Sequence, residues 1–536
     1  MSIRTENRIP VVVGITGHRS IKKQDETALA GAVRTELKKL QACCPNSPLV
    51  MLNSLAEGSD LLCAEIADEL GIPLLASLPR PLEDYEKDFS EAAKEKLSYH
   101  CRRADEVFVV PPLEELPTGG SMRDFQFRQA GIYIVSHCHV LLALWDGGPG
   151  TAAACGTAEA VDFALNGSYA PSSGISLRSE SNEAVIHIVT PRGDRSTEPA
   201  GTVHHLGQWD AFLDVLRKTD DFNRHAGKLR SDSRSRLPTD AADDPELERL
   251  EKIGRSAGQL SRMYAKRFRR VLGFLAVASA LLTFAFLLYD NLDIFWMILI
   301  CGLMLLAAWS CLRYASRSDC HRRYVEYRVL SECLRVQTYL RYAGSRIQAA
   351  GLFSWTQQEE TAWVMDALFA LTVGEAPRTK HEILSCWVED QRDYHRKAAG
   401  RSRKDLQVSE RIVNAALILS VLLYFVAVFF ELSVGGLSIA PGLHLPGAEL
   451  YRTALKVILG TISAVTLFIA NYYGKLSLSR ALSDHQKMEH FYSRMAAQLR
   501  QRGQQEELLE LLAREELIEN GNWCSYQRDN RPDMSL

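Results

Sequence analysis

The first 190 residues alternate short apolar runs with longer amphipathic stretches. The runs are rich in β-branched residues and predict strands, and the stretches between them have apolar residues at helical spacing. Strands that alternate with helices imply an α/β Rossmann-like domain, in which helices cover both faces of a parallel sheet. The expected strands are Pro10–Ile15, Leu49–Leu52, Ile72–Leu78, Glu106–Val110, Val140–Trp145 and Ala184–Thr190. The expected helices are Asp25–Leu40, Glu57–Leu70, Asp84–Leu97, Asp124–Cys138 and Gly156–Leu165.

Four longer apolar stretches predict an all-α membrane domain with four transmembrane helices. The first two have no ionisable residue over about 19 positions each, which is enough to cross a hydrocarbon core about 30 Å thick. The fourth is shorter and contains several hydroxyl side chains, so a buried helix of a soluble core is its alternative. The stretches are Val271–Tyr289, Ile294–Leu312, Ile412–Phe430 and Leu455–Ala470.

Basic residues precede the first and third stretches and follow the second and fourth, so they would all lie on one side of a membrane. The turn Asp290–Asp293 has none, and the connection Glu431–Arg452 has only Arg452. By the positive-inside rule, both connections lie outside, and both termini and the long helices after each hairpin are cytoplasmic. The flanking residues are Arg262, Lys266, Arg267, Arg269, Arg270, Arg313, Arg317, Arg322, Arg323, Arg401, Arg403, Lys404, Arg411, Lys475 and Arg480.

The pattern divides the chain into five parts. Residues 1–190 form the α/β domain and residues 191–255 a linker with a short helix at Gln208–Leu216. Residues 256–345 hold the first hairpin and a cytoplasmic helix at His321–Ala343, and residues 346–410 are helical and cytoplasmic. Residues 411–536 hold the second hairpin and a helix at Leu476–Leu512. The apolar stripes of these two helices predict packing or oligomer surfaces. A charged helix, Pro245–Arg270, leads into the first span, where ligand binding would be transmitted.

Composition and net charge bear on which kinds of partner the chain is expected to bind. Charged residues make up 24% of the chain and the hydrophobic set 46%, so the membrane signal is local and bulk composition resembles that of soluble proteins. A net charge of −3 argues against a nucleic-acid partner, because no excess of positive charge is available to neutralise phosphates. The 12 cysteines have no zinc spacing, so we expect no metal site and a reducing compartment. The first residues lack the pattern of a cleaved signal peptide.

The strand ends carry candidate binding residues, because ligands of such sheets bind beyond the carboxyl ends of the strands. The first strand runs into Gly14, Thr16, Gly17, His18 and Arg19, where glycines allow a close backbone approach and arginine offers a fork for an anion. A simple turn is the alternative reading of this motif.

Two further loops lead into helices at the same edge. The second strand leads into Glu57, Gly58 and Asp60, which either attract a ligand or cap the following helix. After the fifth strand come Asp146 and Gly147, then Gly156, Thr157 and Glu159 at a helix start, an arrangement typical of phosphate loops.

The segments VVVGITGHR, SLAEGSDLLCAEIADELG, LASLPRPLEDYEKDF and YIVSHCHVLLALWDGG, followed by CGTAEAVDFAL, together resemble the SLOG superfamily over about the first 170 residues. The membrane half is similar to SLATT-type effector modules at Trp387–His395 and Arg514–Pro532. These resemblances imply a sensor-effector of bacterial antiphage conflict signalling, in the inner membrane, in which a nucleotide second messenger binds the SLOG domain. SLOG-like domains also form the N-terminus of melastatin-type TRP channels, which implies ligand-gated conduction.

The resemblance adds Pro79, Arg80 and Arg128 to the expected ligand site. It implies no resident cofactor but a nucleotide-like ligand, derived from NAD or ADP-ribose or a cyclic nucleotide. The whole expected set is Gly14, Thr16, Gly17, His18, Arg19, Glu57, Gly58, Asp60, Pro79, Arg80, Arg128, Asp146, Gly147, Gly156, Thr157 and Glu159.

Binding without cleavage is the expected activity. LOG-type relatives are phosphoribohydrolases whose glycine-rich loop is followed by a glutamate, and Ala154 stands at that spacing here. A site without a positioned general acid or base binds its ligand without cleaving it. One alternative is a membrane-anchored nucleoside-monophosphate phosphoribohydrolase that uses Glu159. Another is a membrane scaffold that recognises a protein partner. His137 and His139 are expected to be structural.

Four spans with few polar residues cannot line a wide aqueous path alone, so a pore requires a homo-oligomer in the lipid bilayer. The candidate pore-lining residues are in or just after the fourth span, at Thr461, Ser463, Thr466 and Asn471. The alternative for these residues is helix–helix hydrogen bonding inside one subunit.

Overall fold

The computed structural model forms two compact units, which are described separately below. The sheet unit comprises Met1–Leu260, Glu326–Ile383 and Gln504–Ser525, and the span unit comprises Ser261–Val325, Leu384–Gly503 and Tyr526–Leu536. The structure describes residues 7–111, 121–149, 156–167, 184–192, 198–229, 238, 244–292, 294–374, 380–433, 447–475 and 478–529.

The sheet unit is built on a seven-stranded sheet of order β4-β3-β2-β1-β5-β6-β7. All neighbouring strands are parallel except β6 and β7, which pair in antiparallel fashion. The strand order reverses between β1 and β5, so these two strands flank the switch point of a doubly wound fold. The strands are β1 (Val11–Gly17), β2 (Leu49–Asn53), β3 (Leu74–Leu78), β4 (Glu106–Val109), β5 (Val140–Trp145), β6 (Ala184–Val189) and β7 (Val203–Gly207).

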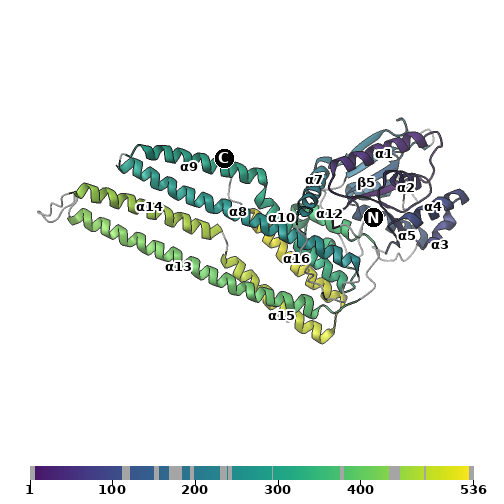
Figure 1. Ribbon diagram of the computed structural model, residues 1–536. Helices are drawn as coiled ribbons and strands as arrows, with labels where there is room; N and C mark the ends of the chain where they lie inside the picture. The colour runs from purple at the N-terminus through teal and green to yellow at the C-terminus, as the bar shows by residue number, and fades with distance from the viewer. Residues whose placement is uncertain are drawn as a thin grey trace. The chain divides into compact units, whose positions relative to one another are not determined.

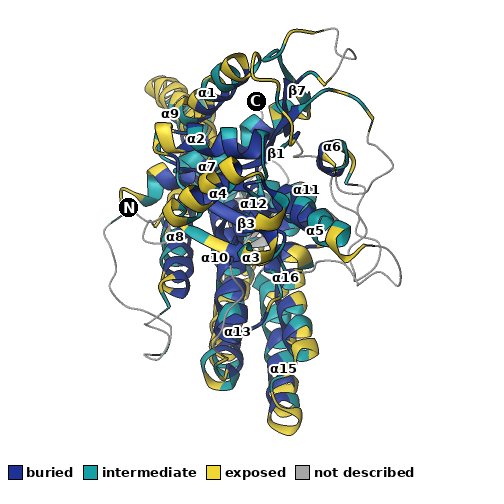
Figure 2. Ribbon diagram, turned by 90° about the vertical axis from the view of Figure 1, so that its right-hand side faces the viewer, coloured by how far each residue is buried: buried dark blue, intermediate teal, exposed yellow. Residues whose placement is uncertain are grey.

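Helices cover both faces of this sheet, as the alternating pattern predicted (Figure 1). Apolar residues of α1, α2, α4 and α7 pack on one face, and those of α5, α6 and α12 on the other. The inner strands β1, β2, β3, β5 and β6 are correspondingly buried, whereas the outer surfaces of α1 and α4 are exposed (Figure 2). The edge strands β4 and β7 are partly exposed. The helices of this part are α1 (Glu26–Cys43), α2 (Ser59–Leu70), α3 (Leu82–Tyr85), η2 (Glu86–Asp88), α4 (Glu91–Arg103), α5 (Met122–His137), α6 (Thr157–Asn166) and α7 (Trp209–Ala226).

The sheet unit also contains helices that come from the second half of the chain. Arg335 of α10 forms an ion pair with Glu516 of α16, and Gln357 Nε2 donates to the Leu517 carbonyl at 2.6 Å. The expected stripe on α10 is buried here, which explains its apolar residues by packing within the chain. The elements are α10 (Cys320–Tyr342), η5 (Ala349–Leu352), α11 (Trp355–Glu360), α12 (Ala362–Leu371) and α16 (Glu506–Asp529), of which α10 and α16 each have one end in the span unit.

Three expectations differ from the structure. The range 191–255, expected to be a linker, contains β7, which extends the sheet beyond β6, and α7, whose Phe212 and Leu216 are in the core. The helix expected at Asp84–Leu97 is interrupted, because Tyr85 and Phe89 turn their rings into the core and Ser90 caps a new helix, α4. The helix expected at Leu476–Leu512 ends at Gly503, whose φ of 75° is the left-handed conformation of a helix C-terminus.

The span unit contains the four expected membrane helices. Cys301 Sγ lies 3.9 Å from the Leu282 carbonyl between α8 and α9, and Ser420 Oγ lies 3.4 Å from Thr466 Oγ1 between α13 and α14. The hairpins meet where Gly460 of α14 packs against the Leu287 side chain of α8. The elements are α8 (Pro245–Leu292), which begins in the sheet unit, α9 (Trp296–Ser318), η6 (Leu384–Glu389), α13 (Asp390–Ser433), α14 (Ala448–Lys475) and α15 (Leu478–Arg502).

The surface of these helices identifies the chain as a membrane protein. At most 17% of the most apolar stretch of each helix is buried inside the chain. Phe429 is 71% exposed and Trp296 is 74% exposed, which a water-soluble surface of this extent would not tolerate. These helices are also long enough to cross a bilayer.

We predict that Gly460→Leu destabilises the span unit by about 1–3 kcal/mol, the range that overpacking of a tight contact costs. A Cβ atom at Gly460 would already lie 2.9 Å from Leu287 Cδ1. Gly302→Leu is the matched control, because a Cβ atom there meets nothing within 4 Å. Melting temperatures in detergent test the prediction, and equal effects of the two changes would contradict it.

Candidate functional site

Glycines at the end of β1 and at the start of α2 allow these two elements to pack closely. A Cβ atom at Gly17 would lie 2.4 Å from Ser59 Cβ, and one at Gly58 would lie 2.2 Å from the Arg19 carbonyl oxygen. The His18 carbonyl accepts hydrogen bonds from Ser59 N–H (3.1 Å) and Ser59 Oγ (2.8 Å). These contacts fix the path of the chain from His18 to Arg19 at the carboxyl edge of the sheet.

His18 lies at the switch point, between the ends of β1 and β5. The backbone N–H of Asp146 donates to His18 Nε2 at 3.0 Å, and an Asp146 carboxylate oxygen lies 3.3 Å from the same atom. Arg192, which follows β6, places Nη1 3.5 Å from His18 Nδ1. Burial lowers the pKa of His18, the Asp146 carboxylate opposes this shift, and Arg192 adds to it. The imidazole is therefore neutral at pH 7.

Gly147 directly follows Asp146 of this group, and α6 begins farther along the chain at Thr157. Gly147 has a φ of 75°, which suits glycine in a tight turn. Thr157 is buried in the first turn of α6, and Gly156 precedes it as the N-cap residue. Residues 150–155, which include Ala154, lie outside the described residues.

A second group, the arginine cluster, consists of Arg19, Arg80 and Arg123 around the ring of Phe127. The guanidinium carbons of Arg19 and Arg123 each lie 4.9 Å from the ring centroid, and that of Arg80 lies 5.7 Å away. Arg19 follows β1, Arg80 follows β3, and Phe127 is in the first turns of α5. Three separate elements therefore bring positive charge to one aromatic ring at the carboxyl edge, an arrangement stabilised by cation–π attraction.

Carboxylates neutralise this cluster only in part. Asp88 pairs with both Arg80 (2.5 Å) and Arg123 (3.3 Å), and Asp124 lies 4.0 Å from Arg123. Arg19 is exposed and has no ion-pair partner within the described ranges.

Two buried polar groups lie under the arginine cluster. Burial raises the pKa of Asp60 to about 7, although Arg19 and a hydrogen bond from Ala56 N–H oppose the shift. The Tyr85 side chain is fully buried, and its hydroxyl has no hydrogen-bond partner among the described residues. Burial raises the pKa of Tyr85, and Asp60, Arg19, Asp88 and Arg80 all contribute to its electrostatic environment. A buried hydroxyl without a partner is costly, so this region has an unused hydrogen-bond donor.

Glu57 and Glu159 are both engaged in local contacts. Glu57 accepts hydrogen bonds from Ser90 Oγ (2.6 Å) and Ser90 N–H (3.3 Å), at the start of α4. Glu159 forms an ion pair with Arg128, whose guanidinium carbon lies 4.9 Å from the Phe163 ring centroid. Arg128 and Glu159 thus connect α5 to α6, and the Glu159 carboxylate already has a cationic partner.

Three further residues of the expected ligand site lie in or directly after the strands β1 and β3. Gly14 is inside β1, where a Cβ atom would lie 2.7 Å from Ile134 of α5, so it serves packing and is not in the loop. Thr16 is half-buried on the same sheet face, and Pro79 is buried between β3 and Arg80. The structure therefore divides the charged and histidine residues of the expected set among the His18 group, the arginine cluster with Asp60 below it, and the Arg128–Glu159 pair, with Glu57 outside all three. Gly14, Gly17 and Gly58 serve packing.

Several residues of the His18 group and of the arginine cluster were not predicted from the sequence. They are Tyr85, Asp88, Arg123, Phe127, His187 and Arg192. Tyr85 and Asp88 lie in the segment LASLPRPLEDYEKDF, and the others come from segments without a recognisable motif. Arg123 and Phe127 precede Arg128 by less than two turns, so a helical projection of the start of α5 was the available signal. His187 Nε2 lies 3.0 Å from the Trp145 carbonyl beside Gly147.

The expected pore-lining residues do not share one open face. Thr466 is buried, with its hydroxyl bonded to the Ile462 carbonyl and close to Ser420 of the same chain. Thr461 bonds to the Val457 carbonyl, whereas Ser463 is exposed. The side chain of Asn471 lies outside the described residues. For Thr466, hydrogen bonding between helices of one subunit is therefore observed.

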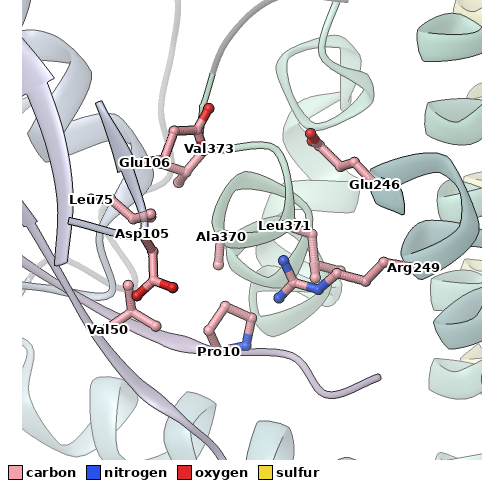
Figure 3. A pocket seen from close by; sticks show the side chains of 10 residues that line it. All are labelled: Pro10, Val50, Leu75, Asp105, Glu106, Glu246, Arg249, Ala370, Leu371 and Val373. Carbon is pink, nitrogen blue, oxygen red and sulfur yellow. The ribbon is translucent and has the colours of Figure 1, made fainter. Parts of the chain in front are cut away.

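A small cavity lies at the opposite, amino edge of the sheet (Figure 3). Its volume of about 20 Å³ admits a water molecule but no nucleotide. Glu246 and Arg249 from the start of α8 line one side, and Asp105, Glu106 and Val373 line others. The cavity therefore marks where α8 packs near the sheet, away from the carboxyl-edge groups. His137 and His139 are buried and bonded to Tyr133 and Val12, in the structural roles expected of them.

The fold defines this chain as a membrane protein with a doubly wound α/β unit. Within the residues that the structure describes, no group of three or more His, Cys, Asp or Glu side chains is arranged to hold a metal ion. No protein-family model matches the chain, and no curated protein matches it. The case for a function therefore depends on the geometry of the carboxyl edge.

We predict that Gly58→Ala lowers the stability of the sheet unit by about 2–3 kcal/mol or more. Its φ of 92° is strained for any residue with a Cβ atom, and that atom would meet the Arg19 backbone. Gly31→Ala in α1 should instead stabilise by about 0.5–1 kcal/mol, because helical alanine is favoured over glycine and nothing lies within 4 Å. Thermal unfolding of both variants provides the comparison, and a neutral Gly58→Ala would refute this account.

Asp60 should make the stability of the fold depend on pH. Its folded pKa of about 7 exceeds the ordinary 3.8, so between these values the unfolded chain has lost a proton that the folded chain retains. Stability from this group is thus lost as pH rises from about 4 to about 7, by up to about 1.4 kcal/mol per pH unit. Relative to wild type, Asp60→Asn should gain melting temperature between pH 5 and pH 8. The exposed control Asp210→Asn should not, and equal profiles would disprove the shift.

Proposed function

We propose that this chain is a membrane-embedded sensor-effector, in which a nucleotide-derived ligand binds the carboxyl edge of the sheet unit and gates a homo-oligomeric pore or membrane-disrupting assembly. The single observation that carries the proposal is the arginine cluster. Three guanidinium groups share one aromatic ring and are only partly neutralised by Asp88 and Asp124. Guanidinium groups bind phosphate through paired hydrogen bonds.

The ligand class follows from the groups beside this cluster. Phosphates of the ligand would contact Arg19, Arg80 and Arg123, and the Tyr85 hydroxyl would supply a further donor. A ribose or base would extend along the edge towards His18 and Gly147, at the switch point where nucleotides bind on such sheets. Phe127 already stacks with the arginines, so it serves to hold their charge in place. The ligand would therefore carry at least one phosphate.

Transmission to the membrane is supported by the continuity of α8. Asp244 caps this helix by accepting from Glu246 N–H at 2.9 Å, and Arg341 binds Glu246 at 2.6 Å. The same helix continues without interruption into the first span. A shift of its first turns would therefore be passed along a rigid element. In a bacterial inner membrane, with the sheet unit in the cytoplasm, such a device would suit antiphage signalling.

Binding is favoured over hydrolysis because of the environment of Glu159. Its carboxylate is paired with Arg128, and a general acid or base must reach the proton that it transfers. Glu159 would therefore stabilise the α5–α6 contact, while the ligand binds without being cleaved.

A thermal-shift screen of the detergent-purified chain tests the proposal. The panel contains NAD, ADP-ribose, cyclic mono- and oligonucleotides, nucleoside monophosphates and inorganic phosphate. A ligand at 100 times its Kd should stabilise the native state by about 2.7 kcal/mol. Arg19→Gln removes a charge-assisted contact worth about 1.5–3 kcal/mol, so it should weaken binding by about 10- to 100-fold.

Tyr85→Phe and Arg34→Gln make the test specific. Tyr85→Phe should leave the melting temperature of the free protein unchanged or higher, because it removes a buried hydroxyl without a partner, yet reduce the ligand-induced shift. Arg34, an exposed arginine paired with Glu69 at 2.6 Å, is the control and should not affect binding. If a ligand stabilises Arg19→Gln and Tyr85→Phe as it does wild type, the arginine cluster is not its site.

Two other outcomes would favour the alternatives. Conversion of a nucleoside monophosphate to base and ribose phosphate, abolished in Glu159→Gln, would establish the hydrolase. Binding of a ligand without any ligand-dependent solute flux in liposomes would refute gating and favour a scaffold.

A further inference from the structure

Positive charge gathers at one end of the span helices as well as in the sheet unit. We define the basic ring as Arg269 and Arg270 of α8, Arg313 of α9 and Arg411 of α13. All four side chains are exposed, and none has an ion-pair partner within the described part of the chain. The helix contacts of the span unit show that these residues share one level.

The first hairpin sets the level of Arg270 and Arg313. Cys301 Sγ and the Leu282 carbonyl are in contact at 3.9 Å, so these residues are at one height on antiparallel helices. Arg270 precedes Leu282 by as many residues as separate Cys301 from Arg313, about 18 Å at 1.5 Å per residue. Arg270 and Arg313 therefore lie at the same height.

The second hairpin brings Arg411 to nearly the same level. Gly460 of α14 packs on Leu287 of α8, and Thr466 lies 3.4 Å from Ser420 of α13. The path from Gly460 to Arg411 runs towards the basic end of the spans, first along α14 to Thr466 and then along α13 from Ser420. It covers about 23 Å of helix. The distance from Leu287 back to Arg270 is about 26 Å. Arg411 is thus within one helical turn of the height of Arg270.

A second tier of basic residues lies one to two turns farther from the apolar spans. It consists of Lys266, Arg267, Arg317, Arg403 and Lys404, all exposed. Aromatic rings accompany both levels: Arg313 lies over Trp309 at 5.8 Å, and Arg267 lies over Tyr264 at 5.3 Å. Paired aromatic and basic side chains are typical of the membrane–water interface.

The height of the ring relative to the bilayer follows from the apolar length of α8. The stretch from Val271 to Tyr289 contains no ionisable group before its terminal tyrosine and spans about 28 Å, close to the thickness of a hydrocarbon core of about 30 Å. Arg270 of the ring directly precedes Val271, the first residue of this stretch. The guanidinium groups of the ring therefore lie at the level of the lipid headgroups.

Few acidic residues oppose this charge. At the same levels, Asp319 follows the end of α9, and Asp405 and Glu410 lie in α13, whereas the corresponding stretch of α8 contains no acidic residue. Asp319 is paired with Arg322 at 3.0 Å. Orienting the helices requires basic residues on one side of the membrane, but it does not require four arginines at one height with open guanidinium groups.

We propose that the basic ring and its second tier bind the headgroups of anionic phospholipids. A guanidinium group can form two parallel hydrogen bonds with the phosphate of a lipid. A net negative headgroup adds the attraction that juxtamembrane basic clusters exert on acidic lipids. The proposal is independent of the nucleotide ligand, because the residues that carry it belong to the span unit.

The test compares lipids added to the detergent-purified full chain. Phosphatidylglycerol should raise the melting temperature by several degrees, and phosphatidylcholine should not. High salt should reduce the difference, because these charges are exposed. This comparison needs no variant, so it remains decisive if a variant fails to fold.

Substitutions then assign the effect to the ring. The triple variant Arg270→Gln/Arg313→Gln/Arg411→Gln should lose most of the response to phosphatidylglycerol. The matched control Arg34→Gln/Arg217→Gln/Arg514→Gln removes the same charge from exposed ion pairs of the sheet unit and should respond like wild type. Arg270→Lys/Arg313→Lys/Arg411→Lys should retain part of the response through charge alone.

Three results would overturn the proposal. The first is an equal response of wild type to phosphatidylcholine and phosphatidylglycerol. The second is an undiminished response of the glutamine triple variant. The third is an equal shift caused by inorganic phosphate, which would make the ring a general anion site instead of a lipid site.

Discussion

Four helices of this chain carry more apolar surface than the chain itself can bury. Their most apolar stretches are at most 17% buried, so a bilayer has to remove the rest from water. In hydrocarbon every backbone polar group must be satisfied within its own segment, which requires long unbroken helices and keeps charged residues at their ends. Within the described helices, the charged side chains that flank the apolar stretches therefore lie at the ends of the spans.

In the sheet unit, the glycines of the expected ligand site serve close packing, whereas its arginines carry the charge that a ligand would bind. Gly14 and Gly17 of β1 make room for α5 and α2, and Gly58 at the start of α2 avoids the Arg19 backbone. Their lack of a side chain is thus explained without any ligand. Arg19, the one residue of the loop after β1 that projects a charge, joins Arg80 and Arg123 from other elements around Phe127. The proposed binding function depends on this convergence and not on the glycines.

The second half of the chain contributes to both units. Helices α10, α12 and α16 pack in the sheet unit, where Arg335 binds Glu516 and Arg341 binds Glu246 at the start of α8. The helices that begin or end near the spans are therefore held by buried ion pairs, which are costly to break one partner at a time. Within the sheet unit, such contacts anchor the first turns of α8, the helix along which the proposed signal would be passed.

The sequence by itself determined the first six strands and the four spans, because apolar periodicity reflects burial that each segment requires wherever it packs. It did not predict β7, which lies in a range expected to be a linker. It predicted the α/β sheet and the four spans, and the glycine and aspartate motifs identified the carboxyl edge as the region of interest. Only the tertiary structure decided which charged residues meet there. Arg123 and Phe127 come from a segment with no motif, and nothing distinguished Tyr85 within its own segment. Glu159 pairs with Arg128 on another helix. It also decided that Arg270, Arg313 and Arg411 share one height, since helix contacts set that height and spacing along the chain does not.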